Sequence, residues 1–163
     1  MPKRPKLLTS MTEGQRFAAW DRELDRAITG PTWLADARVA QAVVDTFLIG
    51  QNQWKLYELT AWVVMSNHVH ILVKPETEIE AITRAVKKYS ATIANRILGK
   101  SGTAFWQDES YDHWVRDSAE LSRIVHYIEW NPVRAGLVTL PEQWLRTSAR
   151  NGQVGNLPHV ITA

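Results

Sequence analysis

The chain has 163 residues, with 19 lysines and arginines, 17 aspartates and glutamates, and no cysteine. This length suits one soluble globular domain and leaves no room for a second large one. Without cysteine there is no disulfide, cysteine-ligated zinc, iron–sulfur cluster or thiol nucleophile, so a nucleophile has to be Ser, Thr, Tyr, Lys or a carboxylate. The formal net charge of +2 is only mildly basic and does not by itself indicate a nucleic-acid partner.

No apolar run is long enough to span a bilayer. The basic stretch Met1–Lys6 is not followed by the long apolar segment of a signal peptide. We therefore expect a cytoplasmic protein.

The first third of the chain carries two helical patterns. Apolar residues recur at helical spacing over residues 15–28, and Gly30–Pro31 ends that pattern. A second helix follows, with Asp36 placed as its N-cap, an apolar stripe over residues 39–47 and an end at Gly50.

The pattern then changes to that of a β-hairpin. Residues 56–65 are rich in aromatic and β-branched side chains, Ser66–Asn67 has turn chemistry, and residues 68–74 alternate between polar and apolar. A helix is predicted next over residues 78–98, ending at Gly99, with four basic residues largely away from its apolar side. These are Arg84, Lys87, Lys88 and Arg96.

The last predicted elements are a strand and a helix. Residues 111–116 suit a strand, and Asp117 then caps a helix with Glu120 at the capping-box position. That helix ends by Asn131, because the residue before Pro132 is disfavoured in the α region. The order of elements predicts an α+β fold with an antiparallel sheet. We expect one domain over residues 1–149 and a tail over residues 150–163 without a packed element.

His68 and His70 are the first candidate site residues. Two residues apart on a strand, their imidazoles point to one face of the sheet, whereas Val69, Ile71 and Val73 point to the other face and pack. Both imidazoles can bind one metal ion. The same pattern also suits two histidines on a half-exposed sheet face, and both interpretations stay open.

Tyr127 and Asn131 form the second part of this candidate site. On a helix they lie about 40° apart, on one flank of the apolar stripe, so that a hydroxyl and a carboxamide project along one edge. That edge offers a nucleophile and an oxygen ligand. Two imidazoles with an amide oxygen suit Mg²⁺ or Mn²⁺ acting on phosphate oxygens. A tyrosine at the boundary of the core is the plainer alternative.

Three segments form one ordered set of motifs: residues 62–73 (WVVMSNHVHILV), residues 105–113 (FWQDESYDH) and residues 127–138 (YIEWNPVRAGLV). This set resembles the single-tyrosine HUH transposases, and most closely their REP-associated tyrosine transposase branch. The resemblance covers about residues 16–149. It implies a ferredoxin-like antiparallel sheet packed with helices.

The resemblance also implies roles for individual residues. His68 and His70 match the HUH pair, Tyr127 matches the nucleophile, and Asn131 matches a third metal ligand four residues after the tyrosine. The implied partner is hairpin-forming single-stranded DNA. A divalent ion, Mg²⁺ or Mn²⁺, would polarise the scissile phosphate while Tyr127 attacks it, which gives a 5′-phosphotyrosine and a free 3′-OH that can be rejoined.

The chain departs from the family pattern at two places. Ser66 stands where the family commonly has proline before Asn-His. The family also begins with a strand in the middle of the sheet, and here only residues 6–11 could supply it. The central strand is therefore short, supplied by another chain or lost, and a monomer and a homodimer both remain open.

Eight basic residues are candidates to contact DNA phosphates: Lys3, Arg4, Lys6, Arg84, Lys87, Lys88, Arg96 and Arg116. Arg134 also flanks the helix that carries Tyr127. Tyr111 is the rival nucleophile, although it lacks a partner like Asn131. Two other functions remain open: a catalytically inactive module that binds hairpin DNA, and a metal-dependent phosphohydrolase that does not use Tyr127.

Overall fold

The computed structural model describes residues 12–26, 30–108, 110–150 and 159–163. The chain divides into two compact units at Gly30–Pro31. The first unit contributes helix α1 (Glu13–Arg26), close to the predicted bounds of 15–28. The elements of the second unit are η1 (Trp33–Ala35), α2 (Ala37–Asn52), β1 (Tyr57–Val64), β2 (Val69–Pro75), α3 (Ile79–Leu98), β3 (Tyr111–Trp114), α4 (Ser118–Glu129), α5 (Asn131–Arg134), η2 (Pro141–Gln143), η3 (Ser148–Arg150) and β4 (His159–Thr162).

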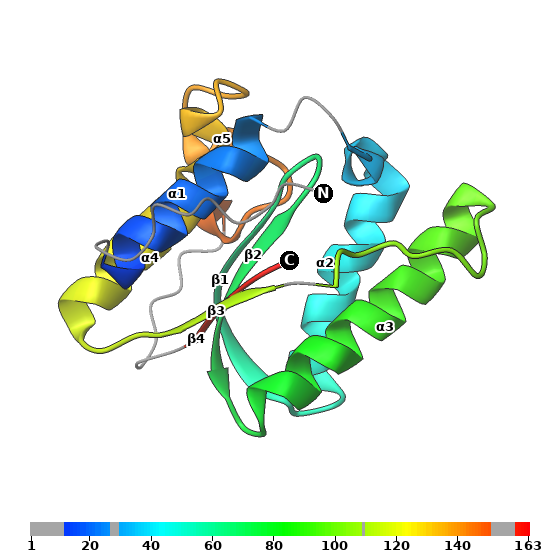
Figure 1. The fold of residues 1–163 in the computed structure, drawn as a ribbon, viewed down its shortest axis with the longest axis horizontal. Helices are drawn as coiled ribbons and strands as arrows, with labels where there is room; N and C mark the ends of the chain where they lie inside the picture. The colour runs from blue at the N-terminus through cyan, green and yellow to red at the C-terminus, as the bar shows by residue number, and fades with distance from the viewer. Residues whose placement is uncertain (1–11, 27–29, 109, 151–158) are drawn as a thin grey trace. The chain divides into compact units, whose positions relative to one another are not determined.

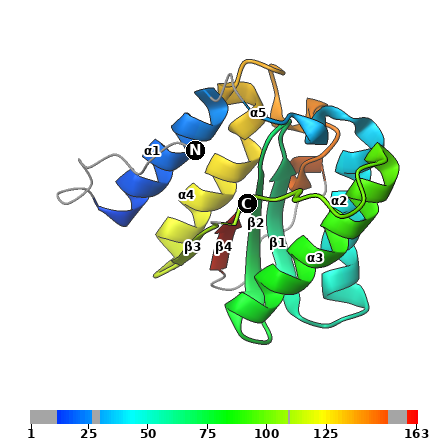
Figure 2. The ribbon, with the colours of Figure 1, turned by 45° about the vertical axis from the view of Figure 1, so that its right-hand side comes forward.

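The second unit is built on a four-stranded sheet with the order β1-β2-β4-β3. Every neighbouring pair of strands is antiparallel, and the strands lie side by side in Figure 2. Helices α2 and α3 cover one face of the sheet, and α4 lies on the other (Figure 1). The predicted α+β fold with an antiparallel sheet packed with helices is therefore confirmed.

The side chains of strand β2 give the two faces of the sheet different chemistry, one apolar and one that carries a histidine. Its side chains alternate, so that Val69, Ile71 and Val73 enter the apolar core with α2 and α3. The intervening His70 points to the opposite face, where α4 packs against β1 and β2. The local sequence pattern thus places the histidine face of the sheet against the helix that carries Tyr127.

Helix α2 begins where the sequence predicts. The Asp36 side chain accepts a hydrogen bond of 2.9 Å from the backbone N–H of Arg38. Hydrogen bonds from the Arg38 guanidinium and backbone lower the pKa of Asp36 to about 2. The helix continues to Asn52, beyond the expected end at Gly50. Gly50 serves a different purpose there: the buried Tyr57 ring passes close to its Cα and donates a hydrogen bond of 2.9 Å to the carbonyl oxygen of Phe47.

Helix α3 begins at Ile79, one residue after the predicted start, and ends at Leu98 as predicted. Ile82 and Val86 are buried on its sheet side, and the helix ends at Gly99, whose φ of 66° is the left-handed conformation that glycine adopts at little cost. Strand β3 ends at Trp114 and is shorter than the predicted 111–116. Within the described residues, no helix combines the length and the apolar character needed to cross a bilayer.

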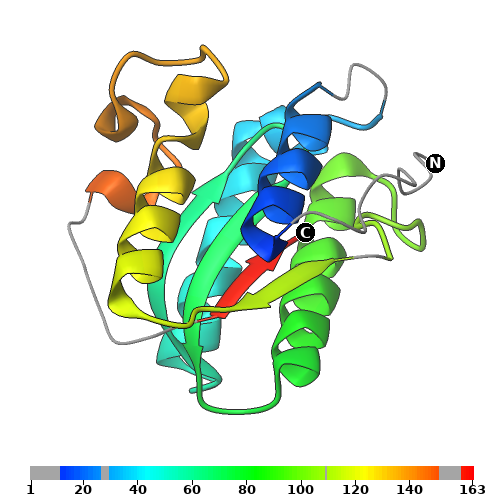
Figure 3. The ribbon, with the colours of Figure 1, turned by 60° about the vertical axis from the view of Figure 1, so that its left-hand side comes forward.

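The expectation that residues 150–163 lack a packed element is wrong for their last part. Residues 159–162 form β4, which lies between β2 and β3 in the middle of the sheet (Figure 3). Ile161 is buried in the apolar core. A four-residue strand is too short for its pattern to stand out from a loop, and it is stabilised by pairing with open backbone on both sides.

The predicted candidate for this central strand, residues 6–11, lies outside the described residues. Among the strands that the structure describes, β4 holds the position between β2 and β3. The backbone of Val69 exchanges two hydrogen bonds with that of Ala163, with N···O distances of 2.8 and 3.2 Å. The last residues of the chain are therefore paired directly beside His68 and His70.

Candidate metal and nucleophile site

The start of helix α4 is held by a network of short hydrogen bonds. The Asp117 side chain accepts from the backbone N–H of Glu120 at 2.7 Å, as an N-cap does. The Glu120 carboxylate accepts from the backbone N–H of Arg116 at 2.7 Å and pairs with His113 Nε2 at 2.8 Å. Asp117 thus caps α4 as predicted, whereas Glu120 does not close the capping box at Asp117: its carboxylate bonds to the residue before the N-cap and to His113, and so ties α4 to β3.

The histidine pair has the geometry of a shared ligand set. The ring centroids of His68 and His70 lie 5.0 Å apart at an interplanar angle of 78°. A ring nitrogen of one lies within 4.8 Å of a ring nitrogen of the other. Both side chains are buried. A divalent ion that sits between two imidazoles needs their nitrogens this close, so the pair fits such an ion.

Each imidazole is oriented by an oxygen atom on its Nδ1 side. His68 Nδ1 lies 2.8 Å from Asn67 Oδ1, and His70 Nδ1 lies 2.8 Å from Thr162 Oγ1. An amide oxygen only accepts hydrogen bonds, so the neutral His68 ring carries its proton on Nδ1 and the lone pair on Nε2. A second hydrogen bond of this kind is the usual way in which a protein orients a metal-binding histidine.

Tyr127 reaches this pair from α4. Its half-buried ring forms a T-shaped pair with that of His70, with a centroid separation of 6.2 Å and an interplanar angle of 77°. The guanidinium of Arg134, on α5, lies over the Tyr127 ring, with its Cζ 3.9 Å from the ring centroid. The tyrosine ring is thus in contact with a candidate metal ligand and has a cation over one face.

Asn131 begins α5 directly after the break in α4. Helix α4 ends at Glu129, as predicted from Pro132, but the chain stays helical because proline is tolerated in the first turn of a new helix. Backbone hydrogen bonds from Trp130 to His126 and from Arg134 to Trp130 bridge the two helices. Asn131 is fully buried, one turn beyond Tyr127. Its role as a metal ligand stays a prediction.

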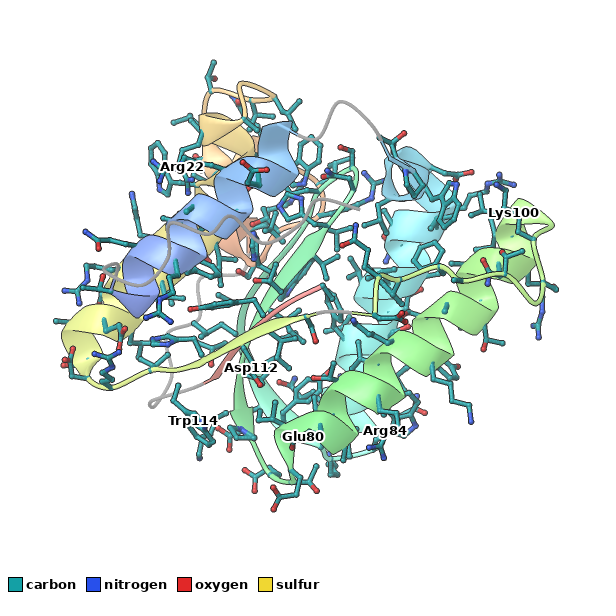
Figure 4. All side chains as sticks on the ribbon, in the orientation of Figure 1. Arg22, Glu80, Arg84, Lys100, Asp112 and Trp114 are labelled. Carbon is teal, nitrogen blue, oxygen red and sulfur yellow. The ribbon has the colours of Figure 1, made fainter. Side chains whose placement is uncertain are left out.

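The predicted DNA-contacting residues fall into three groups. Arg84, Lys88 and Arg96 are exposed on α3, and Arg116 is exposed before α4. Figure 4 labels Arg84 on α3 and Lys100 just beyond the end of that helix. Lys3, Arg4 and Lys6 lie outside the described residues.

Lys87 differs from its neighbours on α3. It is half-buried and donates a hydrogen bond of 2.8 Å to the carbonyl oxygen of Gln107, and burial lowers its pKa. Its position on the predicted basic face is therefore corrected: the side chain turns toward the loop before β3. Lysine stems often bury in this way while the ammonium finds an acceptor, which a helical pattern alone does not reveal.

The sequence predictions missed Thr162 and gave Arg134 no contact with Tyr127, although the structure brings both residues to the site. Thr162 comes from β4, for which the sequence carried only a short β-branched run. Arg134 was noted as flanking the site helix, and its spacing of two helical turns from Tyr127 was the available signal that the two side chains share a face.

Known proteins match this chain in sequence and in structure. A family profile described as Transposase IS200 like matches residues 35–131. A candidate REP-associated tyrosine transposase of Haemophilus influenzae is 28% identical over 101 residues, covering 54% of this chain and 56% of that protein. A REP-associated tyrosine transposase of Escherichia coli K12 is 27% identical over 94 residues, covering 54% and 52%. The chain thus spans about half the length of these curated relatives.

A solved structure of a REP-associated tyrosine transposase bound to a REP hairpin shares the fold, with a TM-score of 0.56 and 21% sequence identity. The match covers 74% of this chain and 70% of that one. The expected HUH transposase fold is therefore present. Because the family profile spans more than half of the sequence, including His68, His70, Tyr127 and Asn131, the chain belongs to the IS200-like transposase family.

Proposed function

We propose that this protein is a metal-dependent enzyme that binds hairpin-forming single-stranded DNA, cleaves it through a 5′-phosphotyrosine and rejoins it. The observation that carries the proposal is the position of Tyr127, whose ring lies against that of His70 and beside the His68–His70 pair. Residues from a strand and a distant helix thus converge as a nucleophile and a metal-binding pair have to. The names of the relatives support the choice of hairpin DNA as substrate.

In the proposed reaction, His68, His70 and Asn131 would hold Mg²⁺ or Mn²⁺. When bound, the ion draws negative charge from the phosphate oxygens. Tyr127 Oη attacks phosphorus, so that an Oη–P bond forms and the bond from phosphorus to the 3′ oxygen breaks. The phenol loses one proton and the 3′ oxygen gains one. The reverse attack by a 3′-OH restores the phosphodiester without an external energy source.

Arg134 supports the nucleophile in this proposal. A guanidinium over an aromatic face is attracted to the ring, which limits the orientations that the ring adopts. The same positive charge stabilises the phenolate that develops during attack. Exposed Arg84, Lys88 and Arg96 on α3 supply sequence-independent phosphate contacts, so hairpin binding should weaken as the salt concentration rises.

The test is detection of a covalent protein–DNA adduct on a denaturing gel. Labelled single strands with REP-like hairpins are incubated with Mn²⁺, Mg²⁺ or EDTA, using wild type, Tyr127→Phe, His70→Ala and Tyr111→Phe. We expect an adduct in wild type and Tyr111→Phe with either metal. No adduct is expected in EDTA or in Tyr127→Phe, and the amount in His70→Ala should fall by at least about a hundredfold.

Hairpin binding by the same proteins, measured by fluorescence anisotropy, makes the test decisive. An adduct that persists in Tyr127→Phe but disappears in Tyr111→Phe would move the nucleophile to β3. Hairpin binding without any adduct, across a panel of hairpin and flanking sequences, would contradict the proposed catalysis and support a binding-only module. Metal-dependent hydrolysis of small phosphodiesters by Tyr127→Phe would support a phosphohydrolase instead.

A further inference from the structure

The register of β4 places Thr162 opposite His70. The two residues are direct partners in the β2–β4 ladder, and the adjacent pair, Val69 and Ala163, exchanges both backbone hydrogen bonds. Paired residues in an antiparallel ladder alternate, so His70 and Thr162 form a non-hydrogen-bonded pair, in which the side chains approach most closely. This explains why a short threonine side chain reaches the imidazole.

The contact between these two side chains is a buried hydrogen bond. Thr162 Oγ1 lies 2.8 Å from His70 Nδ1, and both side chains are at most 1% exposed. The bond can run in two directions. If the hydroxyl donates to Nδ1, the neutral ring carries its proton on Nε2 and cannot bind an ion there. If the hydroxyl accepts from Nδ1–H, Nε2 carries the lone pair.

We propose that Thr162 is a positioning residue for His70: its hydroxyl accepts from Nδ1–H and so holds the imidazole as a metal ligand through Nε2. This inference rests on the proposed function and extends it to the last strand of the sheet. In this role Thr162 is not itself a ligand of the ion. It acts on the orientation and the protonated nitrogen of His70 only.

The second histidine supports this direction of the bond. His68 Nδ1 faces the amide oxygen of Asn67, which can only accept, so the ring of His68 presents Nε2 as the ligand atom. If His70 binds the same ion through Nε2, its Nδ1 has to carry the proton, and Thr162 Oγ1 is then the acceptor. Thr162 therefore does for His70 what Asn67 does for His68, with the difference that Asn67 is adjacent in sequence and Thr162 comes from the opposite end of the chain.

Three full-length variants separate positioning from folding. Thr162→Ser keeps the hydroxyl. Thr162→Val keeps the β-branched shape and removes the hydroxyl. Thr46→Val is the matched control, because it removes a buried threonine hydroxyl that donates to the Ala42 carbonyl oxygen on α2, away from the histidines. Correct folding is checked by thermal unfolding of each variant.

The first readout is the tautomer of His70 in metal-free protein, from long-range ¹H–¹⁵N NMR spectra of the imidazole nitrogens. We expect the Nδ1–H form in wild type, Thr162→Ser and Thr46→Val, and a mixture of tautomers in Thr162→Val. The second readout is Mn²⁺ affinity measured by electron paramagnetic resonance of the free ion. We expect it to fall by about 10- to 100-fold in Thr162→Val and to stay within about threefold of wild type in the other two.

Two results would overturn the proposal: an Nε2–H tautomer in wild type, or unchanged Mn²⁺ affinity in folded Thr162→Val. Neither result depends on DNA cleavage. If the tautomer and the affinities behave as expected but no variant forms an adduct with hairpin DNA, the proposed function fails and the positioning role stands. If Thr162→Val does not fold, the tautomer of His70 in the wild-type protein still tests the proposal, because that measurement requires no substitution.

Discussion

Gly50 shows how a single missing Cβ allows a helix and a neighbouring aromatic ring to pack closely. A Cβ built there overlaps Tyr57 Oη and lies 2.6 Å from Tyr57 Cζ, closer than side chains approach in folded proteins. Tyr57 is buried and its hydroxyl is bonded to the Phe47 carbonyl, so the ring cannot swing away without breaking that bond. The glycine therefore allows α2 to run two residues further while β1 packs against it.

Gly50→Ala is expected to destabilise the protein by about 1–3 kcal/mol, because the overlap forces Tyr57 or α2 to move. The measurement is urea unfolding followed by circular dichroism. Gly14→Ala, in α1, is the control, since the added Cβ meets no described atom within 4 Å. Alanine is the better helix former, so this control should be neutral or stabilising by up to about 1 kcal/mol. Equal effects of the two substitutions would refute the packing argument.

Part of the candidate site could also be predicted from individual residues and their spacing. His68 and His70 share a sheet face because side chains alternate on a strand, and their ring centroids lie 5.0 Å apart. That Tyr127 meets them was implied by the family resemblance, and the structure places its ring 6.2 Å from that of His70. The spacing of two helical turns between Tyr127 and Arg134 allowed a shared face, but the contact of the Arg134 guanidinium with the Tyr127 ring also depends on α5 continuing the helix beyond Pro132.

At the scale of elements, the start of α4 is more than a helix cap. Desolvation raises the pKa of Glu120, but hydrogen bonds from the Arg116 backbone and His113 outweigh it and hold the pKa below its ordinary value of 4.5. A lowered carboxylate pKa contributes stability above the ordinary value, and this stability is lost as the pH falls through the folded-state pKa. The junction between β3 and α4 should therefore become less stable in acid.

Glu120→Gln is expected to lower stability by about 1 kcal/mol at pH 7, because it removes charge-assisted hydrogen bonds. The difference from wild type should shrink as the pH falls from 4.5, where Glu120 of the unfolded chain takes up a proton, through the lower folded-state pKa, below which Glu120 is protonated in both states. Urea unfolding at several pH values measures this. Glu80→Gln, an exposed glutamate in the first turn of α3, is the control. A gap between wild type and Glu120→Gln that stays constant from pH 7 to pH 3 would rule out this role for the carboxylate.

At the scale of the whole second unit, β4 is the element that joins the two halves of the sheet. Among the described strands, β3 pairs with β4 alone, and β4 also pairs with β2. The buried Ile161 anchors β4 in the apolar core with α2 and α3. Loss of that anchor should release β3 before the β1–β2 hairpin.

Ile161→Ala is therefore expected to cost about 2–4 kcal/mol and to accelerate amide hydrogen exchange in β3 and β4 more than in β1. Ile82→Ala on α3 is the matched control: it removes the same volume from the same core, away from β4. Exchange measured by mass spectrometry distinguishes the two. If Ile161→Ala accelerates exchange evenly over the sheet, β3 and β4 do not open separately, and the sheet opens as one unit.

The amino-acid sequence by itself determined the elements with strong local signals. Capping residues and apolar spacing placed α2, α3 and α4, the alternating hairpin placed β1 and β2, and the His-x-His spacing placed two imidazoles on one face. Each of these depends on residues within a few positions of one another, where propensity and periodicity act directly.

Only the tertiary structure decided which segment completes the sheet and what orients the site. The four residues of β4 carry too little pattern to be separated from a loop, and they become a strand because β2 and β3 offer unpaired backbone on both sides. Two side-chain contacts likewise depend on the tertiary structure: the hydrogen bond of Lys87 to the loop before β3, and the hydrogen bond between Thr162 and His70. They join residues far apart in the chain, and their free energy exists only after the core has brought those residues together.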